Sequence, residues 1–400
     1  MLDRKFILEN VEAVKLNCQN RNVPADVDRF VELETARREQ QREVEALNQE
    51  SNAVSKSIGK CKTPEEKAAK MEEGRAIREK IAGVRQTLDA LEKELDQIQR
   101  GIPNMAHPDA PVGDDDGSNL AVAYGKTPVP TWPEGFKPLD HVELAEKLDL
   151  IDFEGGARVA GAGFTPTTTP DLAKNDVLQG TGYIPRGNET QIYSIENSDL
   201  SLIATAEITL GGLLANQTVD AEQLPMRLCG ISHCFRTEAG AAGRASRGLY
   251  RVHQFSKVEM FAFCLPEQSE ALHQELLQLE CDIFDGLEIP YRVVDTATGD
   301  LGGPAYRKYD LEAWMPGRGG YGEVTSTSNC TDYQARRLNA RYRVKGEKGT
   351  NFVHTLNGTA VAISRALLAV MEMYQQEDGS IVVPKALRPY VDFEVIRPKN

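Results

Sequence analysis

The sequence predicts an α+β fold in which an N-terminal antiparallel helical hairpin precedes an antiparallel sheet flanked by helices. Mainly apolar residues recur every three or four positions over residues 30–58 and again over 74–98, which is the spacing of two helices that pack against each other. Arg37, Gln40 and Ser51 fill the remaining positions of the first run. Residues 228–235 and 250–263 are typical of strands, and the second stretch alternates between two faces. A chain of 400 residues is too long for one compact core, so we expect an arm over residues 1–103 and a larger domain over 104–400.

The hairpin is predicted from two apolar stripes and from the residues that separate them. Gly59 can end the first helix, and Thr63, Pro64 and Glu66 supply an N-cap, a proline at the first helical position and a capping-box glutamate for the second. Two helices of roughly thirty residues, at about 1.5 Å per residue, make an arm on the order of 45 Å long. The stripes are Phe30, Leu33, Val44, Leu47, Val54 and Ile58 in the first helix, and Gly74, Ile77, Ile81, Val84, Leu88, Leu91, Leu95 and Ile98 in the second.

The charge distribution limits the partners that the chain can bind. The net charge is −14, and because a uniformly acidic surface repels phosphate, a nucleic-acid partner needs a local exception. Residues 30–100 supply one, since 14 lysines and arginines there nearly balance 15 aspartates and glutamates. Coiled coils are also rich in these residues for solubility alone, so the arm is either a general interaction hairpin or a nucleic-acid contact.

Composition also indicates the compartment. The N-terminus carries charges where a signal peptide needs a hydrophobic run, and no stretch approaches eighteen uninterrupted apolar residues, so we expect a soluble cytoplasmic protein with no membrane partner. The seven cysteines show neither CxxC pairs nor a spacing with histidine that is typical of zinc sites. We therefore expect reduced thiols, mostly buried.

The segment between the two predicted strands concentrates charge. Arg236, Glu238 and Arg251 surround a stretch rich in glycine and alanine, and the second strand carries Phe255 and Glu259 on one face. Arginine binds phosphate, an aromatic ring stacks on a base, and a carboxylate accepts hydrogen bonds from an amino group. Two interpretations stay open at this point: a nucleotide site, or an exposed hairpin whose charges pair with one another.

Two later segments bear on that choice. Residues 360–374 are predicted as a helix that is apolar on nearly all sides, with Arg365 as its only charge before Glu372. Burying an arginine costs several kcal/mol unless a carboxylate or phosphate pairs with it, so Arg365 is either part of a structural ion pair or a ligand clamp. Residues 323–329 place Glu323 beside a run of hydroxyls, which suits a hard cation such as Mg²⁺ or is alternatively a hydroxyl-rich edge strand.

Taken together, these segments resemble the bacterial-type seryl-tRNA synthetases, which are class II aminoacyl-tRNA synthetases. FRTEAG at 235–240 with GLYRVHQFSKVEMF at 248–261 is similar to their second signature motif, and NGTAVAISRALLAVMEMY at 357–374 is similar to the third. TAEITL at 205–210, YDLEAWMP at 309–316 and EVTSTSNCTDYQARR at 323–337 match the seryl branch. The similarity covers nearly the whole chain, and several motifs in this order are far more specific than any one of them.

The resemblance implies a serine--tRNA ligase, which activates serine with ATP to seryl-adenylate and transfers it to the 3′ end of tRNA(Ser), and also of tRNA(Sec). Arg236 and Arg365 are then the expected catalytic residues, the first at the α-phosphate and the second at the γ-phosphate or the adenine ring. Glu238 is expected to hold the adenine amino group. The other expected ATP contacts are Thr237, Val252, Phe255, Glu323, Val324, Thr325 and Ser326.

Serine and metal contacts follow from the same resemblance. Glu323 and Ser326 would bind Mg²⁺, and because these residues are three apart, a regular strand would not direct both at one ion, so we expect a β-bulge between them. The expected serine contacts are Thr205, Ala206, Glu207, Glu259, Asn357 and Thr359. Over residues 1–103 the resemblance implies a tRNA-binding arm that reaches across a homodimer to the long variable arm of the tRNA, and over 104–400 a class II catalytic domain.

One segment departs from the family pattern. After Ala160-Gly-Ala-Gly-Phe164 the family continues through a long amphipathic helix that builds much of the dimer interface, whereas Thr165 to Pro170 follow here at once. Pro166 and Pro170 discourage a helix in this stretch. Two alternatives therefore stay open beside the ligase: a catalytically impaired or incomplete paralogue that acts as a coiled-coil interaction protein, and an enzyme that charges a carrier other than tRNA.

Overall fold

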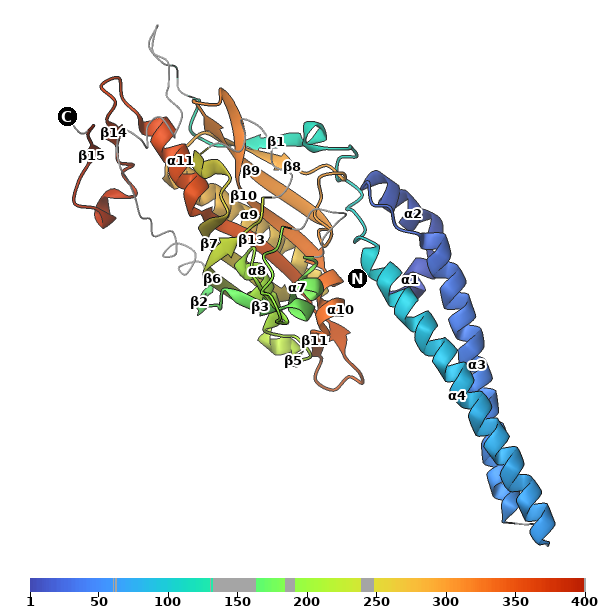
Figure 1. Cartoon of the computed structure of the whole chain (residues 1–400). Coiled ribbons are helices and arrows are strands. Elements are labelled where there is room, and N and C mark those ends of the chain that lie inside the picture. Colours follow the sequence, from blue (N-terminus) through green and yellow to red (C-terminus); the bar gives the residue numbers. More distant parts are fainter. Residues whose placement is uncertain are drawn as a thin grey trace. The chain divides into compact units, whose positions relative to one another are not determined.

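The computed structural model describes residues 1–59, 61, 63–129, 131, 163–183, 191–238 and 248–398. The chain divides into two compact units, Met1–Pro103 and Asn104–Asn400 (Figure 1). Helices make up the first unit, and a mixed, largely antiparallel sheet with helices makes up the second, so the predicted α+β fold is confirmed. No helix among the described residues is long and apolar enough to cross a membrane.

The first unit, here called the arm, is a long helical hairpin preceded by two short helices. Thr63 accepts a hydrogen bond from the Glu66 amide, the Glu66 carboxylate accepts one from the Thr63 amide, and Pro64 stands at the first helical position, which confirms the predicted capping box. Side chains of the two stripes meet in the seam, where Val54 packs with Ile77 and Ile81. The helices are α1 (Arg4–Glu9), α2 (Val11–Asn20), α3 (Val27–Ile58) and α4 (Pro64–Gly101).

An eight-stranded sheet forms the centre of the second unit. Its neighbouring strands pair antiparallel except β2 with β6, which are parallel at one edge. In spatial order the strands are β1 (Leu120–Tyr124), β8 (Tyr291–Asp295), β9 (Arg307–Met315), β10 (Gly320–Thr331), β13 (His354–Ala362), β7 (Gln254–Cys264), β6 (Met226–Phe235) and β2 (Thr165–Thr168).

Helices cover both faces of this sheet because both faces of its central strands are apolar. Even-numbered β7 residues such as Met260 pack in one cluster with α9 (Ser269–Gly286) and α11 (Ile363–Tyr374). The odd-numbered Phe261 and Phe263 pack in a second cluster with α8 (Ala206–Gly212) and α10 (Tyr333–Leu338). Polar side chains at other odd-numbered positions of β7, such as Glu259, therefore lie on the α8 side of the sheet.

Smaller elements complete the second unit. Three small sheets contain β12 (Asn351–Phe352), β11 (Arg341–Arg343) and β5 (Thr218–Asp220); β14 (Ile381–Val382) and β15 (Val395–Ile396); and β3 (Leu172–Lys174) and β4 (Leu200–Leu202). Helix α7 spans Asn175–Thr181, and short 3₁₀ turns lie at Asp116–Ser118, Ala221–Gln223, Gly248–Tyr250, Pro266–Gln268 and Arg388–Tyr390. All seven cysteines are free, five of them buried, as predicted.

Several predicted boundaries were wrong. The strand predicted from Tyr250 begins at Gln254, because Gly248–Tyr250 form a 3₁₀ turn that reverses the chain before the β6–β7 pairing starts. Residues 360–362 belong to β13, so the last apolar helix begins at Ile363. The hydroxyl-rich strand β10 lies between β9 and β13, which excludes the edge-strand alternative.

The segment that departs from the family pattern is described only in part. Strand β2 begins at Thr165, directly after Phe164, and α7 with seven residues is the only helix within 163–183. Residues 160–162, with which the departure begins, and residues 239–247 of the stretch rich in glycine and alanine lie outside the described residues.

Candidate active site

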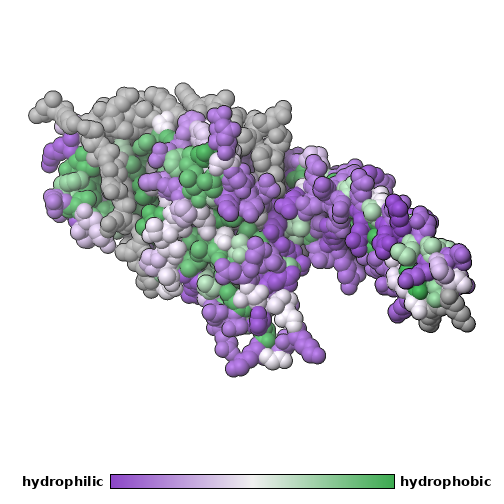
Figure 2. All heavy atoms as spheres, turned by 60° about the horizontal axis from the view of Figure 1, so that its bottom comes forward, coloured by the Kyte–Doolittle hydropathy of each residue, from purple (hydrophilic) through white to green (hydrophobic). Residues whose placement is uncertain are grey.

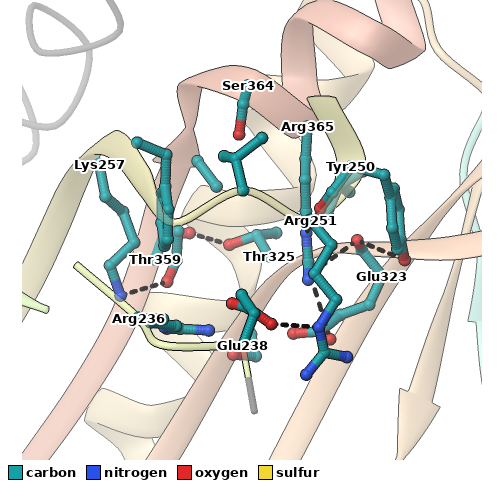
Figure 3. Close-up of a pocket in the computed structure, with 15 residues that line it drawn as sticks. Arg236, Glu238, Tyr250, Arg251, Lys257, Glu323, Thr325, Thr359, Ser364 and Arg365 are labelled. Carbon is teal, nitrogen blue, oxygen red and sulfur yellow. Dashed lines mark hydrogen bonds and ion pairs between the residues drawn. The ribbon is translucent and has the colours of Figure 1, made fainter. Parts of the chain in front are cut away.

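A pocket with about 530 Å³ of open space lies where β7, β10, β13 and the first turn of α11 meet (Figure 3). Four stretches of the chain supply its walls, residues 236–238, 250–257, 323–326 and 359–365. They meet because β10 and β13 are neighbours at the middle of the sheet and β13 runs directly into α11. The lining residues are Arg236, Glu238, Tyr250, Arg251, Val252, Phe255, Lys257, Glu323, Val324, Thr325, Ser326, Thr359, Ala362, Ser364 and Arg365.

Arg365 reaches from α11 to Glu323 on β10. Its Nη1 donates to the Glu323 carbonyl oxygen at 3.0 Å and lies 3.2 Å from Glu323 Oε2, while Nε donates to the Tyr250 carbonyl oxygen at 3.3 Å. Burial favours the neutral form of Glu323, but the charges of Arg365 and Lys308 outweigh it and lower the pKa of this carboxyl to about 2. The predicted carboxylate partner of Arg365 is thus present, and Glu323 is ionised at neutral pH.

A β-bulge separates Glu323 from Ser326. The pairing of β10 with β9 shifts between Glu323 and Thr325, where Glu323 faces Glu312 and Thr325 faces Leu311. The bulge predicted from the three-residue spacing is therefore confirmed, and both Glu323 and Ser326 line the pocket. Among the described residues no group of three or more His, Cys, Asp or Glu side chains is arranged to hold a metal ion.

The end of β6 places two charged side chains at the pocket. The Arg236 guanidinium carbon lies 5.2 Å from the centre of the Phe255 ring, on the neighbouring strand. Glu238 has a left-handed backbone (φ +52°), and its carboxylate forms an ion pair with Arg251. Figure 3 shows Glu238 and Arg251 meeting below Arg365. The carboxylate predicted to hold an amino group is thus already paired with an arginine.

A second polar group lies at the start of α8. Glu207 is buried and its carboxylate accepts hydrogen bonds from Tyr183 Oη at 2.8 Å, Gln334 Nε2 at 2.7 Å and Asn357 Nδ2 at 3.0 Å. Burial, with the nearby charge of Glu259, raises the pKa of this carboxyl to about 7. Thr205 caps the helix by accepting a hydrogen bond from the Glu207 amide at 3.2 Å.

Thr359 connects this polar group to the pocket. Its Oγ1 donates to Glu259 Oε2 at 3.3 Å and accepts from Lys257 Nζ at 3.2 Å, and it lines the pocket itself. Lys257 and Glu259 form a buried ion pair, and the Thr325 hydroxyl donates to the Thr359 carbonyl oxygen. Two buried carboxylates, Glu207 and Glu259, therefore lie near each other beside the pocket, and the buried Lys257 is paired with Glu259.

Most of the predicted site residues converge in this region. Nine of the ten predicted ATP contacts line the pocket, and the exception is Thr237, whose amide donates to the Gln191 carbonyl oxygen. Of the predicted serine contacts, Ala206 differs, because its side chain is fully buried in the apolar cluster of α8 and leaves only backbone to a ligand. Arg365, predicted as a possible adenine contact, lies over the Tyr250 ring with 4.7 Å between guanidinium carbon and ring centre.

Several side chains of this region received no role from the sequence. Arg251 was named as one of the charges near Phe255 but was assigned to no ligand, and Lys257, on the same alternating stretch, was not proposed as a site residue, although both line the pocket. Tyr183 and Gln334, which hold Glu207, carry no local signal because each is far from Glu207 in the sequence.

Comparison with known proteins agrees with this arrangement. The family model for the seryl-tRNA synthetase N-terminal domain matches residues 1–106, and that for the class II tRNA synthetase core domain (G, H, P, S and T) matches residues 191–374. A serine--tRNA ligase of Rhodopirellula baltica is 56% identical over 427 aligned positions that cover 99% of this chain and 100% of the relative.

Solved structures give the same result. A seryl-tRNA synthetase from Pyrococcus horikoshii, complexed with ATP, is 36% identical, with a TM-score of 0.91 and full coverage of both chains. A cytoplasmic serine-tRNA ligase from Naegleria fowleri, in complex with AMP, is 30% identical, with a TM-score of 0.83 over 98% of this chain and 96% of that one.

The alignment also shows that this chain is shorter than a relative, as expected for the segment after Phe164 that departs from the family pattern. The 427 positions aligned with the Rhodopirellula protein exceed the 400 residues of this chain, so at least 27 residues of that relative have no counterpart here. A shortening of this size agrees with the loss of one long helix, and it leaves both family domains in place. With relatives above 30% identity along its whole length, the chain belongs to the seryl-tRNA synthetase family of class II aminoacyl-tRNA synthetases.

Proposed function

We propose that this protein is a serine--tRNA ligase that forms seryl-adenylate from serine and ATP and transfers the seryl group to tRNA(Ser) and tRNA(Sec). The observation that carries the proposal is the convergence of the family's motifs in one pocket, in a chain that resembles serine--tRNA ligases over its full length. An impaired paralogue would be free to lose buried charges that are costly to retain, yet Arg236, Glu323 and Arg365 are all present in the pocket.

Activation needs no protein nucleophile. An oxygen of the serine carboxylate attacks the α-phosphorus of ATP, the bond from that phosphorus to the bridging oxygen breaks, and pyrophosphate leaves with the electron pair. The protein supplies position and charge, as in other phosphoryl chemistry. Arg236 is assigned to the α-phosphate, because its guanidinium is held at the pocket with no carboxylate partner among the described residues. Phe255 and Arg365 are assigned to the adenine and the phosphates, and Glu238 to the adenine amino group.

Glu323 and Ser326 fit a magnesium ion. The carboxylate is ionised, since its pKa is about 2, and the bulge lets both side chains reach the pocket. Two protein ligands are typical of Mg²⁺, which takes its other oxygens from phosphate and water. When bound, such an ion would neutralise charge on the phosphates. The ion pair between Glu323 and Arg365 would then open, freeing the arginine for the nucleotide.

Serine is assigned to the polar group around Thr205, Glu207, Glu259, Asn357 and Thr359, with backbone of Ala206 nearby. Glu207 and Glu259 offer carboxylates to the ammonium group, and Thr359 lies between Glu259 and the ATP pocket. A site built to bond the serine hydroxyl leaves polar groups unpaired when alanine binds, so alanine is rejected strongly. Threonine keeps the hydroxyl and is the harder competitor.

The arm is assigned to the tRNA. Its helical hairpin is nearly neutral in an acidic chain, which lowers the electrostatic cost of approaching a phosphate backbone. From the family, we also propose that the arm contacts the tRNA across a homodimer and that the protein is cytoplasmic. Because the shortened segment lies where the family builds its dimer interface, sedimentation or light scattering on the full chain tests the homodimer directly.

The decisive experiment is ATP–pyrophosphate exchange with the purified full-length chain. Exchange that depends on serine, and is weak with threonine and weaker with alanine, is the expected result. Charging of a tRNA(Ser) transcript then tests the second step separately from the first. A folded protein that shows no serine-dependent exchange would contradict the proposal and leave only a role for the arm.

A further inference from the structure

Arg318 lies beside Tyr250, which lines the proposed ATP pocket, and it has no ion-pair partner among the described residues. It occupies the turn between β9 and β10, and its guanidinium carbon is 4.4 Å from the centre of the Tyr250 ring. Tyr250 lines the pocket and also stacks with Arg365. The Arg318 side chain has no carboxylate or hydrogen-bond partner among the described residues, although it is exposed.

The position of Arg318 is fixed by the turn and by a missing side chain. The Gly317 amide donates to Glu372 Oε2 at 2.8 Å and the Arg318 amide to the Met315 carbonyl oxygen at 3.0 Å, and both bonds anchor the turn. Arg318 Nη1 lies only 2.8 Å from where a Cβ atom would stand on Gly322. Glycine at 322 therefore leaves room for the guanidinium, immediately before the proposed metal ligand Glu323.

Two of the arginines that line the pocket, Arg365 and Arg251, each have a carboxylate partner. Arg365 is paired with Glu323, and Arg251 is paired with Glu238. The Arg318 guanidinium lies next to a pocket proposed to bind the anionic ATP, and it has no carboxylate partner in the described part of the chain. In a protein with a net charge of −14, such a guanidinium can bind phosphate.

We propose that Arg318 binds the β- and γ-phosphates of ATP, and afterwards the departing pyrophosphate. This inference rests on the proposed function, since it assigns a residue to the same reaction. As the bond between the α-phosphorus and the bridging oxygen breaks, the electron pair moves onto pyrophosphate, and the fixed cation of Arg318 stabilises the growing negative charge there. Arg318 is assigned no contact with the adenosine or the α-phosphate, which are assigned to Glu238, Phe255 and Arg236.

The test compares ligands with and without the terminal phosphates. We would measure dissociation constants for Mg·ATP, Mg·pyrophosphate and AMP by calorimetry on the full chain, together with the KM for ATP in exchange. Arg318→Ala is expected to weaken ATP and pyrophosphate about tenfold to a hundredfold, which is the range for losing hydrogen bonds to a charged group, and to change AMP less than twofold. Arg318→Lys, which keeps the charge but not the planar fork, should fall between.

A matched control is available on the same sheet. Arg292 also stacks on a tyrosine, 4.8 Å from the Tyr321 ring centre, but it is paired with Glu312, and Tyr321, unlike Tyr250, does not line the pocket. Arg292→Ala should leave all three ligands unchanged. Equal losses of ATP and AMP affinity in Arg318→Ala would mean that Arg318 only supports Tyr250, and unchanged ATP affinity would also overturn the inference. If the unaltered chain neither binds ATP nor exchanges pyrophosphate, the proposed function fails with it.

Discussion

The arm and the second unit use charge in opposite ways. In the arm, most ion pairs join residues three or four apart on one helix, such as Arg75 with Glu79, whose side chains are 68% and 72% exposed. In the second unit, Lys257 and Glu259 form a pair whose side chains are 8% and 2% exposed. Figure 2 shows mainly hydrophilic side chains over the arm. Exposed pairs of the first kind contribute little to stability, whereas a buried charge without its partner is costly.

This difference indicates which charged residues are the better candidates for a functional site. Buried charges persist only when something compensates them, so a group such as Glu207, Glu259 and Lys257 beside one pocket is more informative than a larger number of charges on a helix surface. Among the described residues of the arm, two charged side chains are buried, Arg21 and Glu34, and Glu34 is paired with Arg37 and Arg38. Burial of Glu34 favours its neutral form, but these arginines outweigh that and lower the pKa of its carboxyl.

The largest effect is expected from breaking the buried pair of the second unit. Lys257→Met keeps the length of the side chain and removes its charge, so Glu259 stays buried without a cation. Loss of one partner of such a pair costs about 3–5 kcal/mol in the free energy of unfolding. Urea denaturation followed by tryptophan fluorescence measures this, because both tryptophans lie outside the arm. A loss below about 1 kcal/mol would contradict the contrast drawn between the two units.

Removing the phosphate-binding arginine comes next. Arg236→Ala should lower serine-dependent exchange by about 10²–10³-fold, since one preorganised contact to a developing charge is worth that much. The arm should stay folded and keep its helical circular dichroism, because Arg236 lies outside the arm. A variant with undiminished exchange would remove the role assigned to Arg236.

Glu280 offers a test in which removing a buried ionisable group stabilises the protein. It is fully buried, neither oxygen has a hydrogen-bond partner among the described residues, and burial raises the pKa of its carboxyl well above the ordinary range. The folded state keeps the proton while the unfolded state loses it above the ordinary pKa, so the cost of Glu280 grows as pH rises from about 4.5.

Glu280→Met should therefore raise the free energy of unfolding by about 1–3 kcal/mol at pH 8, and by less at pH 5. Denaturation curves at the two pH values measure this difference. An equal gain at both pH values would show that packing, and not the titration of the carboxyl, is the cause.

The pH dependence of serine use is the next smaller effect. The pKa of Glu207 is raised to about 7, so its carboxyl is protonated below that pH and loses its attraction for the serine ammonium group. The value of kcat/KM for serine should fall about tenfold for each pH unit below 7. Glu207→Gln should have low kcat/KM at every pH and no such slope; a persistent slope in this variant would assign the titration to another group.

The smallest effect is expected in the arm. Arg75→Ala removes an exposed pair with Glu79 and should change the free energy of unfolding by no more than about 0.5 kcal/mol. The midpoint of the loss of helical circular dichroism in urea is the readout. A change as large as that of Lys257→Met would mean that exposure does not separate the two kinds of pair.

The sequence was most informative where spacing alone determines geometry. The capping box at Thr63 and the bulge between Glu323 and Ser326 were both predicted from offsets of three residues and are confirmed. The start of β7 was wrong because the strand continues only where β6 offers partners, and Phe235 opposite Gln254 is the last of these. The hydrogen-bond donors to Glu207 could not be predicted, because Tyr183 and Gln334 are far from it in the sequence and approach it only through tertiary packing.

The pairing of Arg365 with Glu323 makes ligand entry an exchange of partners. Without ligand, the guanidinium and the carboxylate neutralise each other, so the pocket holds no excess charge at this point. A nucleotide that arrives together with its cation replaces one ion pair by two, with phosphate on Arg365 and the cation on Glu323. The nucleotide or the cation alone would bind more weakly, because each would leave either Glu323 or Arg365 without a partner of opposite charge. The two should therefore bind with positive cooperativity, each raising the affinity for the other by the same factor.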